Sequence, residues 1–188
     1  MIFYSHFSTN TLSNCYIIGP DHGGEAIIID PGMFDTKLLT VIEENDLYLK
    51  YILVTHSHES HTRGIRTILK IYNADIFSYR HSIMEVRTNK VRDFIKINCG
   101  EFEFEALETP GHSGDSITFR INRSLFTGDS LFAGSIGTVS DGFARGLILS
   151  SLREKILTFD DDFLIFPGHG PPSKLGIEKK FNPDLQED

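Results

Sequence analysis

The stretch Thr55-His56-Ser57-His58-Glu59-Ser60-His61 carries three histidines within seven residues, directly after the apolar run 51–54. A short apolar run of this kind predicts a β-strand, so the histidines are expected where the chain leaves a sheet. Histidines at positions i and i+2 after a strand converge on one ion when the turn is tight, and imidazole is a natural ligand of zinc and iron(II). A lone histidine is usually a satisfied polar residue, but this cluster predicts a metal site.

Three further stretches place polar residues after predicted strands: Thr109-Pro110-Gly111-His112-Ser113, Thr127-Gly128-Asp129-Ser130 and Pro167-Gly168-His169-Gly170. The glycines allow sharp turns and a close approach of the backbone. Asp129 by itself is equally well interpreted as a turn residue, and its context favours a ligand. His112 and Asp129, added to His56 and His58 of the first stretch, complete a four-ligand shell from three separate parts of the chain.

Apolar patterning predicts strands and helices that alternate in both halves of the chain. The expected strands are 3–7, 14–18, 26–29, 51–54, 76–78, 116–121, 124–127 and 163–166, with antiparallel strands within 90–107. The expected helices have apolar stripes within 38–47, 62–71 and 147–159, while 134–146 is expected to be a loop and the chain to fray from about Pro183. This pattern indicates an α/β fold of two sheets covered by outer helices.

Length and composition are those of one globular domain spanning residues 1–188. No apolar run approaches the roughly 20 residues of a membrane span, and no signal-peptide pattern is visible, so we expect a cytoplasmic protein without a membrane partner. The net charge of −8 disfavours nucleic acid as a partner. Cys15 and Cys99 are interpreted as buried free thiols.

Taken together, these motifs resemble those of the metallo-β-lactamase superfamily, in its glyoxalase-II-like branch of small single-domain hydrolases. The likeness runs nearly from end to end, and the stretch 128–137 (Gly-Asp-Ser-Leu-Phe-Ala-Gly-Ser-Ile-Gly) is especially specific to that branch. The resemblance implies an αββα sandwich, in which two mixed sheets carry outer helices and the metal site lies along one edge of the sheets.

The resemblance also implies a site for two metal ions. Its ligands are five imidazoles and one bridging carboxylate: His56, His58 and His112 for the first ion, His61 and His169 for the second, and Asp129 for both. Asp129 and His61 are the expected catalytic residues. Zn²⁺ is the expected cofactor, with Fe²⁺ or Mn²⁺ as alternatives, and the expected activity is hydrolysis of a small ester or thioester by metal-activated water.

One departure from the family pattern concerns the second ion. The family's first motif reads His-x-His-x-Asp-His, and the aspartate position is occupied here by Ser60. A serine hydroxyl is a poor zinc ligand and lacks the negative charge, so the second site is expected to be weakened. Glu59 is expected to point elsewhere, Arg63 to bring a cation near the site, and Arg145 either to replace a family arginine or to begin a helix.

Two other functions remain open. Persulfide dioxygenases share the fold and hold one iron with two histidines and an aspartate, which correspond here to His56, His112 and Asp129. The alternative is a catalytically degenerate metal-binding protein, for which Ser60 is the main support. The partner is expected to be a small-molecule substrate, and the oligomeric state is left open.

Overall fold

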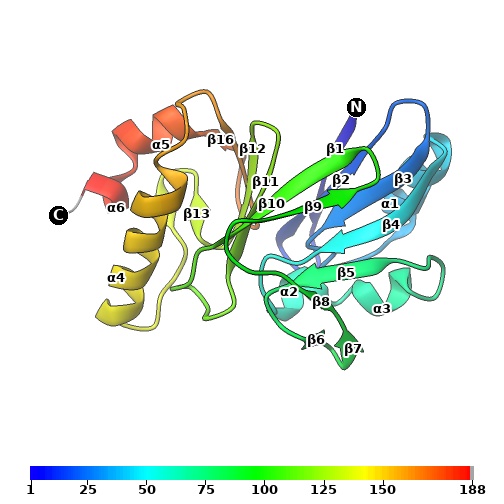
Figure 1. Cartoon of the computed structure of the whole chain (residues 1–188), viewed down its shortest axis with the longest axis horizontal. Coiled ribbons are helices and arrows are strands. Elements are labelled where there is room, and N and C mark those ends of the chain that lie inside the picture. The colour runs from blue at the N-terminus through cyan, green and yellow to red at the C-terminus, as the bar shows by residue number, and fades with distance from the viewer. Residues whose placement is uncertain (187–188) are drawn as a thin grey trace.

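A computed structural model describes residues 1–186 and contains two six-stranded sheets packed face to face (Figure 1). The first sheet has the order β1-β2-β3-β4-β5-β8, with strands Ile2–Ser8, Ser13–Gly19, Gly24–Ile29, Leu47–Leu53, Asp75–Ser78 and Asn89–Lys90. The second has the order β16-β15-β12-β11-β10-β9, with strands Ser173–Lys174, Leu164–Pro167, Ser124–Gly128, Ile117–Ile121, Phe102–Glu108 and Ile95–Cys99. The predicted sandwich of two mixed sheets is confirmed.

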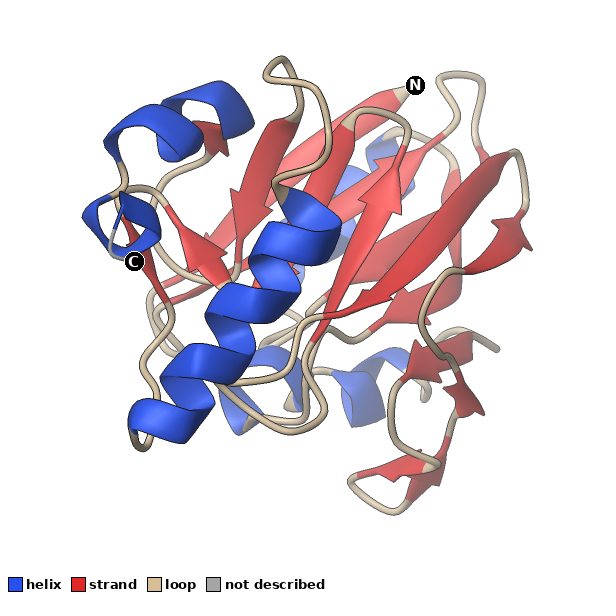
Figure 2. Cartoon of the chain, turned by 60° about the vertical axis from the view of Figure 1, so that its left-hand side comes forward, coloured by secondary structure: helices blue, strands red, loops and turns tan. Residues whose placement is uncertain are grey.

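Helices cover both outer faces of the sandwich (Figures 1 and 2). On the first sheet these are α1 (Thr36–Glu44), α2 (Glu59–Thr62) and α3 (Ile65–Ile68). On the second sheet they are α4 (Gly142–Ser151), its π-helical continuation η1 (Leu152–Ile156), α5 (Leu175–Phe181) and α6 (Pro183–Gln186). Two small hairpins, β6–β7 (Ser82–Ile83 and Val86–Arg87) and β13–β14 (Leu131–Phe132 and Ser135–Ile136), complete the fold.

Side-chain alternation along β2 explains how the layers hold together. Cys15 and Ile17 point outward into a cluster with Leu38 and Ile42 of α1, whereas Tyr16 packs between the two sheets. Strand β3 alternates in the same way, so residues on both of its faces are buried. Burial of both faces is why these strands read as continuous apolar runs. The prediction of buried free cysteines at positions 15 and 99 is also confirmed.

The second sheet buries its outer face under the C-terminal helices. Leu125 and Ile165 of the sheet pack with Ile148 of α4, Leu152 of η1 and Leu175 of α5. Figure 2 shows α4 lying across this sheet. Within residues 1–186 the chain passes from the first sheet to the second between β8 and β9, so each large sheet is built from one continuous part of the sequence.

Several predicted boundaries were wrong. Leu47 begins β4 and is not part of the preceding helix, because Asp46 adopts a positive φ of 52° and reverses the chain. The helix expected over 62–71 is two short helices, α2 and α3, separated where Gly64 packs against the backbone of Pro31. Burial against the backbone leaves no room for a side chain there.

The loop predicted for 134–146 and the helix predicted for 147–159 also need correction. Residues 131–136 form the β13–β14 hairpin, and α4 begins already at Gly142, where the Asp141 carboxylate accepts a hydrogen bond from the backbone N–H of Ala144. This cap outweighs the two glycines in the first turns. Residues 183–186 form α6 and are not frayed; the remainder of that prediction, 187–188, lies outside the described residues. None of the helices in residues 1–186 is long and apolar enough to cross a membrane.

Candidate metal centre

The six residues singled out from the sequence come together at one edge of the two sheets. From the first sheet, His56 and His58 follow β4 and His61 lies in α2; from the second, His112 follows β10, Asp129 follows β12 and His169 follows β15. They form two groups that share Asp129: His56, His58, His112 and Asp129, and His61, Asp129 and His169. Within each group the possible ligand atoms all lie within 4.8 Å of one another. The sequence-predicted site is therefore brought together as one constellation.

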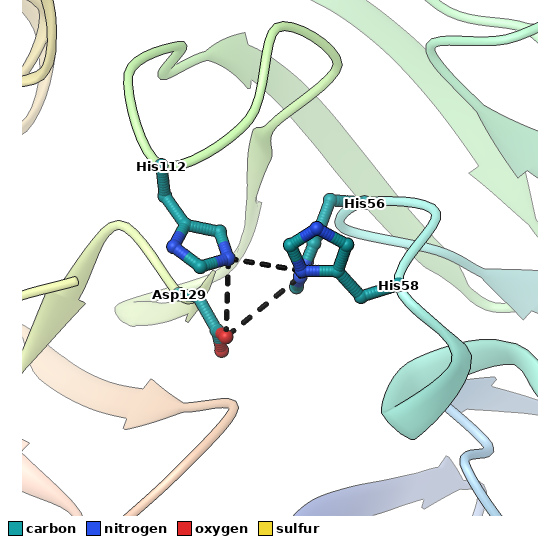
Figure 3. A group of neighbouring side chains, drawn as sticks. All are labelled: His56, His58, His112 and Asp129. Carbon is teal, nitrogen blue, oxygen red and sulfur yellow. Dashed lines mark hydrogen bonds and ion pairs between the residues drawn. The ribbon is translucent and has the colours of Figure 1, made fainter. Parts of the chain in front are cut away.

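The first group has the spacing of a metal shell. His58 Nδ1 lies 3.0 Å from both His56 Nε2 and His112 Nε2. Asp129 Oδ2 lies 3.4 Å from His112 Nε2 and 3.7 Å from His56 Nε2. Figure 3 shows these four side chains facing a common point. Ligands about 2.0–2.1 Å from a tetrahedral zinc ion are separated by about 3.3 Å, so the donor set fits one divalent ion.

The second group lies against both oxygens of Asp129. His61 Nε2 lies 3.4 Å from Asp129 Oδ1, and His169 Nε2 lies 3.5 Å from Asp129 Oδ2. His61 Nε2 and Asp129 Oδ1 are buried and have no hydrogen-bond partner. A buried polar atom left without a partner costs about 1–3 kcal/mol. A cation between these two atoms would satisfy both, so this group also fits a metal ion.

Hydrogen bonds on the far side of the rings fix which nitrogen faces the site. The backbone carbonyls of Thr138 and Leu12 accept from Nδ1 of His112 and His169, at 2.8 and 2.6 Å. A carbonyl can only accept, so Nδ1 carries the proton in both rings and the lone pair of Nε2 faces the site. His56 is held in the same way by the Thr55 hydroxyl, 3.1 Å from its Nδ1.

Asp30 supports the site, and no role there was assigned to it from the sequence. Its Oδ2 accepts from the Thr55 hydroxyl at 2.6 Å and lies 3.2 Å from His61 Nδ1, while Oδ1 accepts from the Thr55 N–H at 2.8 Å. The carboxylate thereby directs Nε2 of His61 toward Asp129 and orients the hydroxyl that holds His56. The available signal was an acidic residue directly after the continuous apolar run 26–29.

Charge and burial act together in the site. Burial, reinforced by the neighbouring His61, lowers the pKa of His56 to about 3, so this imidazole is neutral and able to ligate. Burial also lowers the pKa of His61, but the carboxylates of Asp30 and Asp129 outweigh it and raise that pKa to about 10. Burial raises the pKa of Asp129, yet the positive charge of the nearby His61 reverses the effect and lowers that pKa to about 2. Without a metal ion, His61 therefore carries the positive charge that the two carboxylates require.

Two glycines allow the backbone to approach the ligands. A Cβ added to Gly168 would lie 2.4 Å from Asp129 Oδ1 and 2.5 Å from His61 Cε1. A Cβ added to Gly137 would lie 1.7 Å from the carbonyl oxygen of Asp129. Neither contact is sterically allowed, so glycine at these positions is a requirement of the site.

The departures from the family motif leave the second group without a further carboxylate. The backbone carbonyl of Ser60 accepts from the Ser13 hydroxyl at 2.7 Å. In the described part of the chain, the Ser60 side chain makes no hydrogen bond. Glu59 and Arg63 form an exposed ion pair with each other at 3.0 Å. Glu59 therefore does not replace the missing ligand, as expected, whereas Arg63 points its charge toward solvent.

Arg145 was expected either to replace a family arginine or to begin a helix, and its position matches only part of the second expectation. It lies in the first turns of α4, and its guanidinium donates to Asp184 Oδ1 at 2.9 Å. The other oxygen of Asp184 accepts from the N–H of Ile136 at 2.9 Å. Arg145 thus joins α4 to α6, and Asp184 joins α6 to the β13–β14 hairpin. The other three histidines lie outside the cluster: His6 pairs with Asp35, His22 pairs with Glu101, and His81 contacts Lys90.

Comparison with known proteins agrees with this geometry. The model of the metallo-beta-lactamase superfamily matches residues 9–169. The chain belongs to this superfamily, and the resemblance inferred from its motifs is confirmed.

Three similar proteins illustrate the range of the family. Hydroxyacylglutathione hydrolase GloC of Haemophilus influenzae is 32% identical over 200 residues, which cover 92% of each chain. The crystal structure of the BLEG-1 B3 metallo-beta-lactamase has a TM-score of 0.89 at 26% identity, covering 99% of this chain and 100% of that one. The crystal structure of ETHE1 from Myxococcus xanthus has a TM-score of 0.90 at 26% identity, covering 100% of this chain and 86% of that one. Relatives with different names thus share the fold.

Proposed function

We propose that the chain is a metal-dependent hydrolase of a small ester or thioester, with a full site for one ion and a weakened site for a second. The observation that carries the proposal is the convergence of five histidines on the two oxygens of Asp129, with the outer nitrogens of His56, His61, His112 and His169 already held by fixed groups. Preorganised ligands of this kind bind an ion without rearrangement.

His56, His58, His112 and Asp129 would hold the first ion, and His61, His169 and Asp129 the second. Such an ion lowers the pKa of water and polarises a carbonyl oxygen, the two requirements of ester and thioester hydrolysis. Zn²⁺ is the ion that this set of imidazoles and one carboxylate favours, with Fe²⁺ or Mn²⁺ as alternatives.

The residues differ in their access to a substrate. His61 is fully buried, so we assign it the role of holding Asp129 and the second ion, with no direct contact to the substrate. Asp129 remains ionised at neutral pH, because its pKa is lowered to about 2. Its carboxylate can therefore accept a hydrogen bond from a nucleophilic water and orient it. His58 and His169 are the more accessible ligands and mark the side from which a substrate approaches.

Support for a thioester substrate comes from the relatives. The hydrolase of Haemophilus influenzae, named for a hydroxyacylglutathione substrate, matches this chain over 92% of both lengths. A hydroxyacylglutathione hydrolase of Francisella tularensis is 34% identical over 166 residues. The matched segment covers 87% of this chain and 65% of that protein.

A second candidate is a mononuclear iron oxygenase. His56, His112 and Asp129 supply two imidazoles and one carboxylate, the donor set of non-haem iron sites that keep positions open for oxygen. Ser60 favours this candidate, because the chemistry requires no second ion. The similarity to ETHE1 is compatible with it.

One experiment separates the candidates. Purified protein loaded with Zn²⁺, Fe²⁺ or Mn²⁺ is tested for hydrolysis of S-lactoylglutathione and of neutral thioesters, and for oxygen uptake with glutathione persulfide. Thioester hydrolysis that depends on Asp129 and His56 supports the hydrolase. Persulfide-dependent oxygen uptake with iron alone, without hydrolysis, would replace it by the oxygenase, and neither activity would leave a metal-binding protein without catalysis.

A further inference from the structure

A cavity of about 400 Å³ lies beside the metal centre and takes no part in holding the ions. It is lined by residues 79–82, Lys90, Gly114 and Asp115. We call it the basic pocket, because Arg80 and Lys90 are its cations and Asp115 is the only carboxylate among its lining residues. The whole chain carries 26 acidic and 18 basic side chains. The basic pocket therefore has the opposite sign of charge from the protein as a whole.

The charge that faces the basic pocket comes from Lys90. Asp115 is 5% exposed and is paired with Arg80, so these two charges compensate each other. The Lys90 ammonium lies 3.2 Å from His81 Nε2 and 5.7 Å from the ring centre of Tyr79. Among residues 1–186 it has no carboxylate partner. A cation held in place without a counter-ion is a site for an anion.

Hydrogen bonds fix the wall that carries these groups. The hydroxyl of Ser78 donates to the carbonyl of Arg80 at 3.0 Å, and Thr88 N–H donates to the carbonyl of His81 at 2.9 Å. Val91 N–H donates to the carbonyl of Ser78 at 2.8 Å, which closes the excursion from β5 to β8. The segment carrying Tyr79, His81 and Lys90 is therefore braced at both ends.

The basic pocket is joined to the loops that carry the metal ligands. Asp115 accepts a hydrogen bond from the Ser113 hydroxyl at 2.7 Å, and Ser113 directly follows the metal-ligand candidate His112. Gly114 is two residues beyond His112, so their Cα atoms are at most about 7 Å apart. In Figure 1, α2 and the β6–β7 hairpin after the pocket lie at the same edge of the molecule. The pocket and the first group of ligands therefore share the loop that carries His112, Gly114 and Asp115.

We propose that the basic pocket binds an anionic oxygen group of the substrate, a carboxylate or a phosphate, several bonds away from the carbonyl that is attacked. The inference rests on the proposed function only in calling this molecule a substrate. Lys90 supplies the charge, and Ser82 and the Gly114 backbone line the same cavity. The substrate class is thereby narrowed to anionic esters and thioesters.

Binding is tested without catalysis. Glutarate and, separately, inorganic phosphate are titrated into zinc-loaded protein, and the amide signals of Ser82, Lys90 and Gly114 are followed by NMR. We expect saturable shifts with one of the two anions, and the tighter of them identifies the chemical group. Lys90→Gln should weaken this binding about five- to tenfold. Lys96→Gln, which removes an exposed lysine of β9 that is paired with Glu103 of β10, should leave it unchanged.

A second variant guards against a local effect of Lys90. A Cβ at Gly114 meets no atom within 4 Å, so Gly114→Ala should occupy part of the pocket without a clash and weaken binding of the same anion. Absence of saturable shifts at the pocket with both anions, or equal affinity in the parent and Lys90→Gln, would overturn the proposal.

Kinetics then connect the pocket to turnover. With an anionic and a neutral thioester of the same acyl group, Lys90→Gln should raise KM about five- to tenfold for the anionic one alone. If no thioester is hydrolysed while the anion still binds at the pocket, the proposed function fails and the pocket stands. If both thioesters are hydrolysed with unchanged KM, the hydrolase stands and the pocket proposal fails.

Discussion

Asp30 and His61, 31 residues apart in the sequence, are joined by a contact of 3.2 Å between Oδ2 and Nδ1 in the buried part of the metal centre. The contact decides which nitrogen of His61 faces Asp129. Asp30 also adopts a positive φ of 50°, a conformation that asparagine tolerates at least as well as aspartate. The role of its charge can therefore be tested without changing the backbone.

Asp30→Asn should weaken metal binding by His61 and His169 about 10- to 100-fold, because the amide cannot stabilise the required ring orientation by charge. The first ion should be affected less, since His58 and His112 do not contact Asp30. Calorimetric titration with Zn²⁺ measures both affinities. Glu59→Gln, an exposed change two residues from His61, serves as the control, and equal affinities in parent and Asp30→Asn would contradict the assignment.

His112→Ala should remove one of the four ligands of the first ion and lower its affinity about 100-fold or more. Because bound metal stabilises only the folded state, the difference in Tm between metal-loaded and metal-free protein should shrink. Elemental analysis and thermal unfolding provide the measurements. His22→Ala changes an exposed histidine outside the cluster and should alter neither quantity; full metal content in His112→Ala would remove this residue from the site.

Dialysed protein should retain about one tightly bound ion per chain, because the second group lacks the carboxylate that the family motif provides. Ser60→Asp should raise the affinity for the second ion about tenfold or more and increase thioester hydrolysis. Ser60→Ala is the matched neutral control and should resemble the parent. Two tightly held ions in the parent would show that the site needs no carboxylate at position 60.

Gly168→Ala should destabilise the protein by about 1–3 kcal/mol and weaken metal binding, since the added methyl group meets Asp129 and His61. The control is Gly146→Ala in α4, where an added Cβ meets no atom within 4 Å. That change should stabilise the protein by about 0.4–1 kcal/mol. Denaturant unfolding compares the two, and a neutral Gly168→Ala would contradict the close approach described above.

Residues of the site could be predicted from the sequence where their arrangement leaves a local pattern, and not where it depends on contacts between distant residues. His56, His58 and His112 were identifiable because ligand side chains must follow strand ends in a tight turn, which leaves a local pattern. Asp30 was not assigned its role, because its partners Thr55 and His61 are remote in sequence and a carboxylate before Pro31 reads as a turn residue.

Fold prediction failed where tertiary contacts or caps decide. The start of α4 was missed because two glycines lower helix propensity locally, while the Asp141 cap that stabilises the helix is a single residue. The extent of the helix over 62–71 was misjudged because Gly64 is buried against backbone from another part of the chain, which no local periodicity reveals.

The passage of the chain between the two sheets has a consequence for assembly. His56, His58 and His61 precede the passage and His112, Asp129 and His169 follow it, so neither half of the sequence holds more than three ligands. An ion shared by both halves acts as a removable crosslink. The protein can be produced as two fragments, 1–91 and 92–188. Burial of the apolar side chains between the two sheets favours their association, and the binding energy of the ion stabilises only the assembled pair. Association of the two fragments should then tighten with Zn²⁺ and be released by a chelator.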